Sequence, residues 1–391
     1  MAKNIAIFTT SYLPIQGGVQ YLLYWLLSEI DNNYNYYQDK YNFDNFYFIS
    51  PNLHKNEHAK FYNIKLIETV SIDTKLNKIR CIWQILSYVK YYKINLIHAQ
   101  NAYFDSLCCN FAKRFSNMHY IVTSHGEDVA HMKEFNYGGV LGLNAKRIIK
   151  NNLSNANLIT TISQDMCEFI YEIAPKEKVI LIPNSLPYVE EKIDQELLNE
   201  RIKSLKSKYF LDDNSIVCLS LSGAREIKGH KNMILGFNNS YKKNQNLRLF
   251  IAAHGELTES LNLLVKQLKL DEVIHFVGFI TGATKEAFFN ISNVYVNTAY
   301  FEPFGLVYLE SIKQNIVNLA SNRGGGKDIF THKKNAYLIN PHSIEEISNG
   351  FIYLCNSRVR NELIKASQKL LPRYQTNKIV EEYFEIYMKA I

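Results

Sequence analysis

The sequence predicts an α/β fold of two doubly wound, Rossmann-like domains, each built on a parallel sheet. The chain has 391 residues, a length that favours two domains of ordinary size. Short, almost continuously apolar runs alternate with longer helical patterns from end to end, which is typical of parallel strands buried on both faces. The composition agrees, because 47% hydrophobic and 21% charged residues are ordinary for a globular protein and exclude a disordered chain.

The first half of the chain contains six short apolar runs separated by helical patterns. Because apolar residues follow one another in each run with little alternation, each is expected to be a strand covered on both faces. The expected strands are 5–9, 46–50, 96–99, 121–124, 158–162 and 179–182, and the helical patterns include 19–30, 76–92, 143–153 and 164–173.

The second half repeats this rhythm. Alternation of strand and helix implies right-handed βαβ units, and these units build doubly wound sheets. The expected strands are 216–221, 248–253, 273–277, 294–297, 316–320 and 337–339, and the expected helices are 231–241, 257–268, 285–292, 306–314, 344–355 and 361–371.

The segment PNSLPYVEEKID (183–194) separates the two series. Two prolines and a charge cluster end the first series, and a charged helical segment (195–209) leads into the second. We therefore predict a first domain of residues 1–187 and a second domain that begins at residue 188. In doubly wound sheets, ligands bind beyond the carboxyl ends of the strands, so the unusual residues at those ends are the candidates for function.

The charge and the cysteines restrict the setting in which the protein works. A net charge of +7 is moderate and fits a protein that holds phosphates or contacts an anionic membrane. The six cysteines form no Cys-x-x-Cys pair and are expected to be free thiols in a reducing compartment. The N-terminus does not read as a signal peptide, so the expected location is the cytoplasm. The segment 75–93 is basic, aromatic and amphipathic, and is either a membrane-surface helix or a core-packing helix.

Two motifs follow strands of the first domain. Gly17 and Gly18 stand where a helix begins, and paired glycines let backbone N–H groups approach an anion there; an ordinary turn into the helix is the alternative. His125 follows the fourth expected strand, so its ring points toward the ligand crevice, unless it is a core or surface histidine. Asp128, three residues on, could orient or charge a neighbouring group.

A pair of cations follows the first strand of the second domain. In SGAREIKGH, Arg225 and Lys228 come between a glycine turn and a helix. Such cations can stabilise a leaving phosphate, Lys as a point charge and Arg as a fork of donors. The alternative is a solvated helix entry.

The most specific pattern is FEPFGLVYLE. It carries two carboxylates, Glu302 and Glu310, separated by seven residues, with Gly305 opening a helix between them. The N–H groups of Gly305, Leu306 and Val307 would be free donors for a phosphate at the helix N-terminus. Carboxylates accept strong hydrogen bonds from hydroxyls, so they suit sugar and ribose rings. A glycine loop, GGGKD, lies between a later strand and a helix and is a further loop where the backbone can approach another group closely. The sequence has no Asp-x-Asp pattern that would hold a divalent metal against a diphosphate.

Taken in order, these motifs resemble the family 4 (group 1) retaining glycosyltransferases of the GT-B fold. The resemblance spans nearly the whole chain, through GGVQ, SHGED, TISQDM, IPNS, GAREIKGH, VGF, FEPFGLVYLE and GGGKD. It implies an acceptor-binding domain of residues 1–187, a nucleotide-sugar-binding domain of residues 188–375 across a cleft, and a last helix, 376–391, that crosses back to the first domain.

The resemblance also implies roles for individual residues. Glu302 matches the acid that binds hydroxyls of the donor sugar, and Glu310 matches the acid on the ribose. Lys228 matches the lysine that neutralises the leaving diphosphate. Arg225 is displaced by one residue from the usual spacing, and PNSLP departs from the usual hinge motif. Gly305, Leu306 and Val307 match the loop that contacts the sugar and the diphosphate. Gly17 and Gly18 match the loop over the phosphates, and His125 matches the histidine near the reacting sugar.

The implied activity is retaining, metal-independent transfer from a nucleotide-sugar, with a UDP-sugar favoured, and without a cofactor. The implied acceptor is a saccharide or a lipid-linked molecule in surface glycan biosynthesis (lipopolysaccharide, capsule or glycoconjugate). Peripheral contact with the inner face of the cytoplasmic membrane is left open, and no nucleic acid partner is expected. Two alternatives stay open: a GT-B nucleotide-sugar 2-epimerase, and a catalytically silent subunit that partners another glycosyltransferase.

Overall fold

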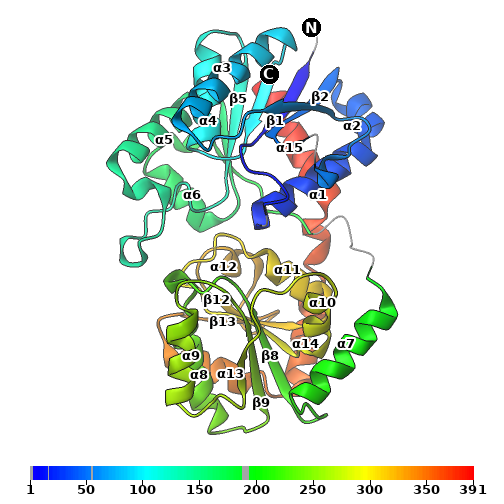
Figure 1. Cartoon of the computed structure of the whole chain (residues 1–391), viewed down its shortest axis with the longest axis vertical. Helices are drawn as coiled ribbons and strands as arrows, with labels where there is room; N and C mark the ends of the chain where they lie inside the picture. The colour runs from blue at the N-terminus through cyan, green and yellow to red at the C-terminus, as the bar shows by residue number, and fades with distance from the viewer. Residues whose placement is uncertain (1–2, 16, 54–55, 187–192) are drawn as a thin grey trace. The chain divides into compact units, whose positions relative to one another are not determined.

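A computed structural model describes residues 3–15, 17–53, 56–186 and 193–391. The chain divides into two compact units (Figure 1). The N-terminal unit comprises Met1–Val189 with Tyr374–Ile391, and the C-terminal unit comprises Glu190–Arg373. Each unit contains one parallel sheet, so the predicted fold class of two Rossmann-like α/β domains is confirmed.

The N-terminal unit is built on a seven-stranded sheet of order β3-β2-β1-β4-β5-β6-β7. Every neighbouring pair is parallel, and Ile5 of the first strand pairs with Phe46 on one side and Leu96 on the other. The strands are β1 (Asn4–Phe8), β2 (Asn45–Pro51), β3 (Lys65–Thr69), β4 (Leu96–Ala99), β5 (His119–Ser124), β6 (Leu158–Thr161) and β7 (Val179–Leu181).

One strand of this sheet was absent from the sequence-based prediction. β3 lies at the sheet edge, with Lys65 exposed and Ile67 and Thr69 buried. An edge strand that is covered only in part alternates polar and apolar residues, so it lacks the continuous apolar run by which the other strands were found.

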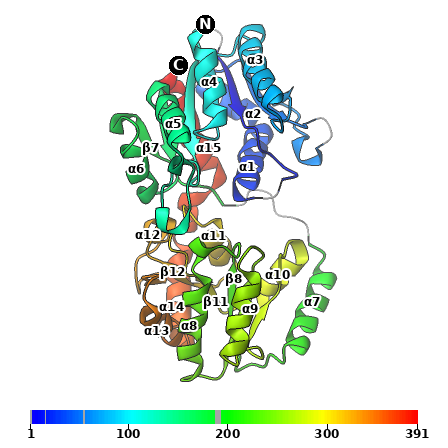
Figure 2. The same ribbon diagram turned by 60° about the vertical axis from the view of Figure 1, so that its left-hand side comes forward.

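The helices of this unit form two groups (Figure 2). In one group α3 packs against α4 and α4 packs against α5, and in the other α15 packs against α1 and α2. Right-handed crossovers from a central β1 to strands on either side place the two groups on opposite faces of the sheet. The helices are α1 (Gly18–Asn32), α2 (Tyr34–Tyr41), α3 (Lys75–Tyr91), α4 (Phe104–Arg114), α5 (Leu143–Asn155), α6 (Gln164–Tyr171) and α15 (Thr376–Ala390).

The C-terminal helix α15 is part of the N-terminal unit because its aromatic side chains are buried there. The ring of Phe384 stacks on Tyr37 and Tyr41 of α2, with centroids 5.1 Å and 5.0 Å apart. His98 of β4 lies 2.7 Å from the Tyr387 hydroxyl. Burial lowers the pKa of His98 to about 3, so this ring is neutral at physiological pH.

The C-terminal unit is built on a six-stranded parallel sheet of order β10-β9-β8-β11-β12-β13. Its strands are β8 (Ile216–Leu221), β9 (Leu247–Ala252), β10 (Ile274–Phe276), β11 (Val294–Asn297), β12 (Val317–Ser321) and β13 (Tyr337–Ile339). Its helices are α7 (Gln195–Lys208), α8 (His230–Tyr241), α9 (Thr258–Gln267), α10 (Gly282–Ile291), α11 (Leu306–Lys313), α12 (Gly325–Ile329), α13 (Ile344–Tyr353) and α14 (Ser357–Gln368).

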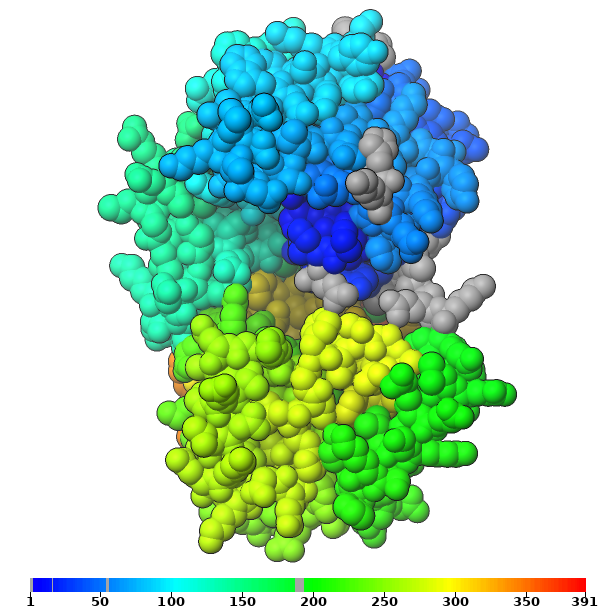
Figure 3. All heavy atoms as spheres, viewed as in Figure 1, coloured from blue at the N-terminus to red at the C-terminus, as the bar shows by residue number. Residues whose placement is uncertain are grey.

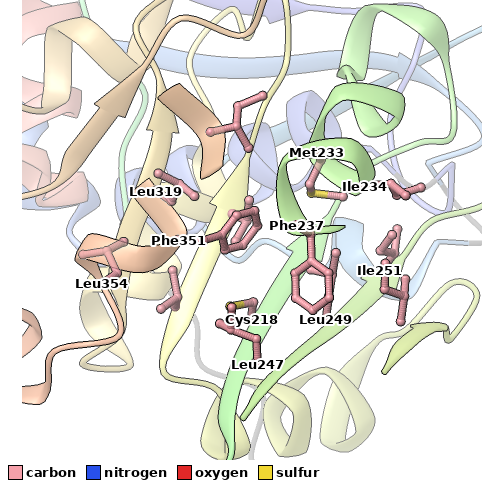
Figure 4. Close-up of a cluster of buried hydrophobic side chains, with 14 of the residues drawn as sticks. Cys218, Met233, Ile234, Phe237, Leu247, Leu249, Ile251, Leu319, Phe351 and Leu354 are labelled. Carbon is pink, nitrogen blue, oxygen red and sulfur yellow. The ribbon is translucent and has the colours of Figure 1, made fainter. Parts of the chain in front are cut away.

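The core of this unit joins the sheet to the helices α8 and α13 (Figure 4). Phe237 of α8 and Phe351 of α13 meet edge to face with centroids 5.5 Å apart, over Cys218 and Leu249 of the sheet. The six cysteines of the chain are free thiols, and five of them are buried. This core fixes the carboxyl edge of the sheet, where the candidate site lies.

Candidate functional site

The candidate site lies beyond the carboxyl ends of β8 and β11. The chain winds outward from β8 through β9 to β10, and outward from β11 through β12 to β13. The two central neighbours β8 and β11 therefore flank the point where the strand order reverses, which is where ligands bind in doubly wound sheets. Lys228 follows β8 and Glu302 follows β11, so both come from the loops at this point.

Lys228 and Glu302 form an ion pair at the centre of the site. Lys228 Nζ lies 2.8 Å from Glu302 Oε2, and their side chains are 19% and 15% exposed. Asn297 Nδ2 donates to the same Oε2 atom at 3.3 Å. The carboxylate and the ammonium are thus held together, with part of each still open to a ligand.

Backbone contacts hold the two loops against each other. The Tyr300 N–H donates to the carbonyl of Ile227 at 2.9 Å, and the Thr298 hydroxyl donates to the carbonyl of Gly229 at 3.1 Å. Gly229 has a φ of +66°, and a Cβ atom there would lie 2.1 Å from the Thr298 carbonyl oxygen. A glycine is required next to Lys228 because the neighbouring loop approaches this closely.

The glycine loop GGGKD packs against the loop that carries Glu302. The Gly325 N–H donates to the Glu302 carbonyl oxygen at 2.9 Å. Gly324 has a φ of +65°, and a Cβ atom there would lie 1.9 Å from that same oxygen. The close approach expected at this loop is therefore made to the backbone of Glu302, which the glycines help to position.

Replacing Gly324 with alanine is expected to lower the free energy of unfolding by about 2–4 kcal/mol, because the new Cβ atom adds a backbone clash to the cost of a left-handed conformation. Gly278→Ala is the matched control, since Gly278 has a φ of +72° with no atom within 4 Å of the added Cβ. It should cost only about 1–2 kcal/mol. Chemical denaturation measures both, and equal losses would contradict the packing role of Gly324.

Gly305 opens the helix that follows Glu302. It has a φ of +83° and immediately precedes α11. Leu306 and Val307, in the first turn, are partly exposed, and first-turn N–H groups have no acceptor within their own helix. These amides lie in the loop after β11, and Lys228, from the loop after β8, pairs with Glu302 of that same β11 loop. The amides and the ammonium can therefore bind one anionic group together.

Glu310 lies further along α11 and is paired with a lysine. Lys285 Nζ of α10 lies 2.7 Å from Glu310 Oε2, and the two side chains are 31% and 16% exposed. Lys285 was not among the residues predicted from the sequence, because it stands in an amphipathic helix without any motif. Only the packing of α10 beside α11 could reveal it.

Arg225 lies in the loop after β8 that also carries Lys228. It directly precedes the short helical turn Glu226–Lys228, and its side chain is exposed. The structure thus brings Arg225, Lys228, Glu302, Gly305, Leu306 and Val307 to one edge of the C-terminal unit, with Glu310 on the helix that follows. His125, Gly17 and Gly18 belong to the N-terminal unit.

His125 follows β5, as predicted. Its Nε2 lies 3.1 Å from the side-chain oxygen of Gln100, while its Nδ1 is buried without a hydrogen-bond partner. Burial lowers the pKa of His125 to about 4, so the ring is neutral at physiological pH. Asp128 accepts from the Ser124 hydroxyl at 2.7 Å and from the Ala102 N–H at 2.8 Å. It thus anchors the loop that carries His125.

Gly17 and Gly18 lie at the start of α1. Gly17 precedes the helix with an extended backbone (φ −178°), and Gly18 is the first helical residue. An extended backbone is open to any residue, so the conformation of Gly17 does not itself require glycine. Among the described residues, no group of three or more His, Cys, Asp or Glu side chains could hold a metal ion.

The fold and this site define a class of protein: a two-domain α/β protein with a Lys–Glu ion pair and glycine-rich loops at the carboxyl edge of its second sheet. Residues 44–187 match the family described as Glycosyltransferase Family 4, and residues 201–370 match Glycosyl transferases group 1. The chain belongs to this group of glycosyltransferases, and the predicted family is confirmed.

Relatives and solved structures agree with this assignment. An uncharacterized glycosyltransferase of Methanocaldococcus jannaschii is 25% identical over 237 residues, which is 60% of this chain and 60% of that protein. Alpha-monoglucosyldiacylglycerol synthase of Streptococcus pneumoniae is 20% identical over 79% of this chain and 69% of its own length.

Anabaena HepE in complex with UDP and glucose superposes with a TM-score of 0.74 at 17% identity, over 99% of this chain and 100% of its own. The lipopolysaccharide outer core galactosyltransferase WaaB superposes with a TM-score of 0.72 at 15% identity, over 99% of this chain and 100% of its own. At these identities the likeness shows the fold, which is GT-B.

Proposed function

We propose that the protein is a retaining, metal-independent glycosyltransferase that uses a nucleotide-sugar donor, with UDP as the favoured nucleotide. The observation that carries this proposal is the Lys228–Glu302 pair, 2.8 Å apart, beside the N-terminus of α11 at the switch point of the sheet. A cation next to free amides suits a diphosphate, and a carboxylate beside them suits the hydroxyls of the sugar joined to it.

In this proposal the C-terminal unit stabilises the leaving diphosphate. The glycosidic bond breaks toward an oxocarbenium-like state, and negative charge develops on the phosphate oxygen. That charge is stabilised by preorganised hydrogen-bond donors, which do not have to rearrange during the reaction. These donors are Lys228, Arg225 and the amides of Gly305, Leu306 and Val307. Glu302 accepts hydrogen bonds from the donor sugar, and Glu310 accepts them from the ribose.

Three residues of the N-terminal unit are assigned to the donor sugar and its phosphates. We assign the neutral ring of His125 to the reacting sugar, with its buried Nδ1 as the unused hydrogen-bonding atom. Gly17 and Gly18 are assigned to the phosphates. The acceptor hydroxyl attacks the face from which the diphosphate leaves, and the leaving phosphate takes its proton, so no separate general base is required.

The acceptor is proposed to be a saccharide or a lipid-linked molecule of a surface glycan. The names of similar proteins support this class. They are an alpha-monoglucosyldiacylglycerol synthase, a poly(ribitol-phosphate) alpha-N-acetylglucosaminyltransferase of Staphylococcus aureus and a lipopolysaccharide outer core galactosyltransferase. Free thiols favour a cytoplasmic reaction. In the part of the chain that the structure describes, no helix is long and apolar enough to cross a bilayer.

Product analysis tests the proposal. The full chain is incubated with UDP-, GDP- and ADP-sugars, with and without saccharide or glycolipid acceptors, and the products are resolved by mass spectrometry and NMR. Acceptor-dependent transfer with retained anomeric configuration is expected. A new nucleotide-sugar epimer or free sugar formed without acceptor would favour the 2-epimerase alternative. No product from any donor, together with a failure to bind any nucleotide, would favour the silent subunit.

Removing divalent metal is expected to leave transfer unchanged. The charge on the diphosphate is assigned to Lys228, Arg225 and helix amides, so a metal ion has no required part. The measurement compares initial rates in EDTA and after addition of Mg²⁺ or Mn²⁺. A rate that falls to background in EDTA and returns with metal would contradict this part of the mechanism.

Replacing Lys285 with methionine is expected to raise the KM for the donor about tenfold with little change in kcat, because the Glu310 carboxylate loses the cation that holds it in place. Lys285→Arg keeps the positive charge and should restore most of the affinity. Steady-state kinetics at varied donor concentration measures both. An unchanged KM in the methionine variant would remove Lys285 from the donor site.

A further inference from the structure

The outer side of α3 exposes large apolar side chains to water. Leu76, Ile79 and Trp83 are 58%, 55% and 57% exposed. Their spacing of three and four residues aligns them on one side of the helix. The opposite side of α3 is also apolar, since Cys81, Ile85, Leu86 and Val89 are buried in the unit. The helix therefore packs on the core and still presents a second apolar stripe.

The apolar surface continues from α3 onto α4. The ring of Trp83 meets Phe111 edge-on with centroids 5.2 Å apart, and Phe111 contacts Phe115 at 5.0 Å. Phe115 is 55% exposed. We call Leu76, Ile79, Trp83, Phe111 and Phe115 the aromatic ridge. Single exposed apolar residues are ordinary, but a contiguous apolar patch on a monomer marks an interaction surface.

Exposed basic side chains lie on the same two helices as the aromatic ridge, and we call this set the basic rim. Five exposed cations lie on the two helices: Lys75, Lys78, Arg80, Lys90 and Arg114. Helix α3 contains no acidic residue, and the one acidic residue of α4, Asp105, is buried. Asp73, just before α3, is the nearest exposed acid in sequence. The outer side of α3 is part of the light-blue surface in the upper half of Figure 3.

We propose that the aromatic ridge and its basic rim dock the protein on an anionic lipid bilayer. Tryptophan and other large apolar side chains enter the boundary between headgroups and acyl chains, and nearby lysines and arginines are attracted to anionic headgroups. A protein partner fits less well, because lysine is depleted in protein–protein interfaces. The inference rests on the proposed transfer to a lipid-linked acceptor, which it places at the membrane surface.

Trp83 provides the test, because the chain has two tryptophans and the other, Trp25, is 7% exposed. The full chain is titrated with vesicles of phosphatidylcholine, alone or mixed with phosphatidylglycerol. We expect binding to the mixed vesicles, with a blue shift of tryptophan emission and quenching by brominated acyl chains. The Trp83→Phe variant should bind nearly as well without either signal.

Three variants test the surface by vesicle sedimentation. Ile79→Ser/Trp83→Ser should reduce the partition coefficient by about tenfold or more. Lys78→Glu/Arg80→Glu should abolish the preference for phosphatidylglycerol. Leu143→Ser, at an exposed leucine of the same unit (87% exposed), should bind like the wild type. Thermal melting confirms that each variant is folded.

Several outcomes would overturn the inference: no binding of the wild type to mixed vesicles, binding that the Ile79/Trp83 variant retains, or a concentration-dependent dimer that buries Trp83 instead. Nucleotide binding measured on the same samples separates this inference from the proposed function. If UDP binds while vesicles do not, only the docking surface is wrong. If no nucleotide binds, the glycosyltransferase proposal itself fails.

Discussion

Replacing Glu302 with glutamine is expected to reduce glycosyl transfer by about 10²- to 10³-fold, mainly in kcat. Glutamine keeps the size of the side chain but removes the charge that pairs with Lys228 at 2.8 Å and that accepts hydrogen bonds from the donor sugar. Initial-rate kinetics with the preferred donor measures the loss. The fold should persist, because this side chain lies in a loop beyond the sheet.

A matched carboxylate provides the control for Glu302. Glu272 is exposed and lies two residues before β10, so it is at the opposite edge of the same sheet. Glu272→Gln should leave both kcat and KM unchanged. Equal activity of the Glu302 and Glu272 variants would show that the carboxylate next to Lys228 has no part in transfer.

Replacing Lys228 with methionine is expected to lower kcat by a similar factor, about 10²- to 10³-fold, because the positive charge that opposes the developing diphosphate charge is lost. Methionine fills much of the volume of the lysine side chain. Glu302, whose side chain is 15% exposed, then lacks its cation. Lys228→Arg should recover only part of the rate, since the planar guanidinium group of arginine does not reproduce the compact charge of the lysine ammonium. Lys266→Met, at an exposed lysine of α9, is the control.

The double variant Glu302→Gln/Lys228→Met tests whether the two residues act as a unit. Residues in direct contact give non-additive effects, so the double variant should be only slightly slower than either single variant. Rate losses that multiply would indicate two independent roles.

The fold could be predicted where burial imposes a continuous apolar pattern. The central strands, such as β8 and β11, were located in this way because both faces of the sheets are covered. Helix α2 was not predicted, since its residues Tyr34–Tyr41 carry no apolar periodicity. It is stabilised by contacts remote in sequence, chiefly the stacking of Tyr37 and Tyr41 on Phe384 of α15.

The site could be predicted where several residues share one loop, as around Glu302 and Gly305. Pairings between separate elements could not: the contact of Lys285 with Glu310 depends on how α10 packs beside α11. The same holds for the glycine loop GGGKD. The sequence indicates that this loop approaches another group closely, but it does not indicate that this group is the backbone of Glu302. The roles given to the candidate residues of both units stay predictions.

Nucleotide binding tests the central claim most directly. The melting temperature of the full chain is measured in EDTA with UDP, GDP, ADP and CMP, for the wild type and for Lys228→Met. A ligand at 100 times its Kd stabilises the native state by about 2.7 kcal/mol. We predict a clear upward shift with a nucleoside diphosphate, UDP foremost, that is strongly reduced in the variant. No shift with any nucleotide, or an equal shift in both proteins, would contradict the assignment of this site to the donor diphosphate.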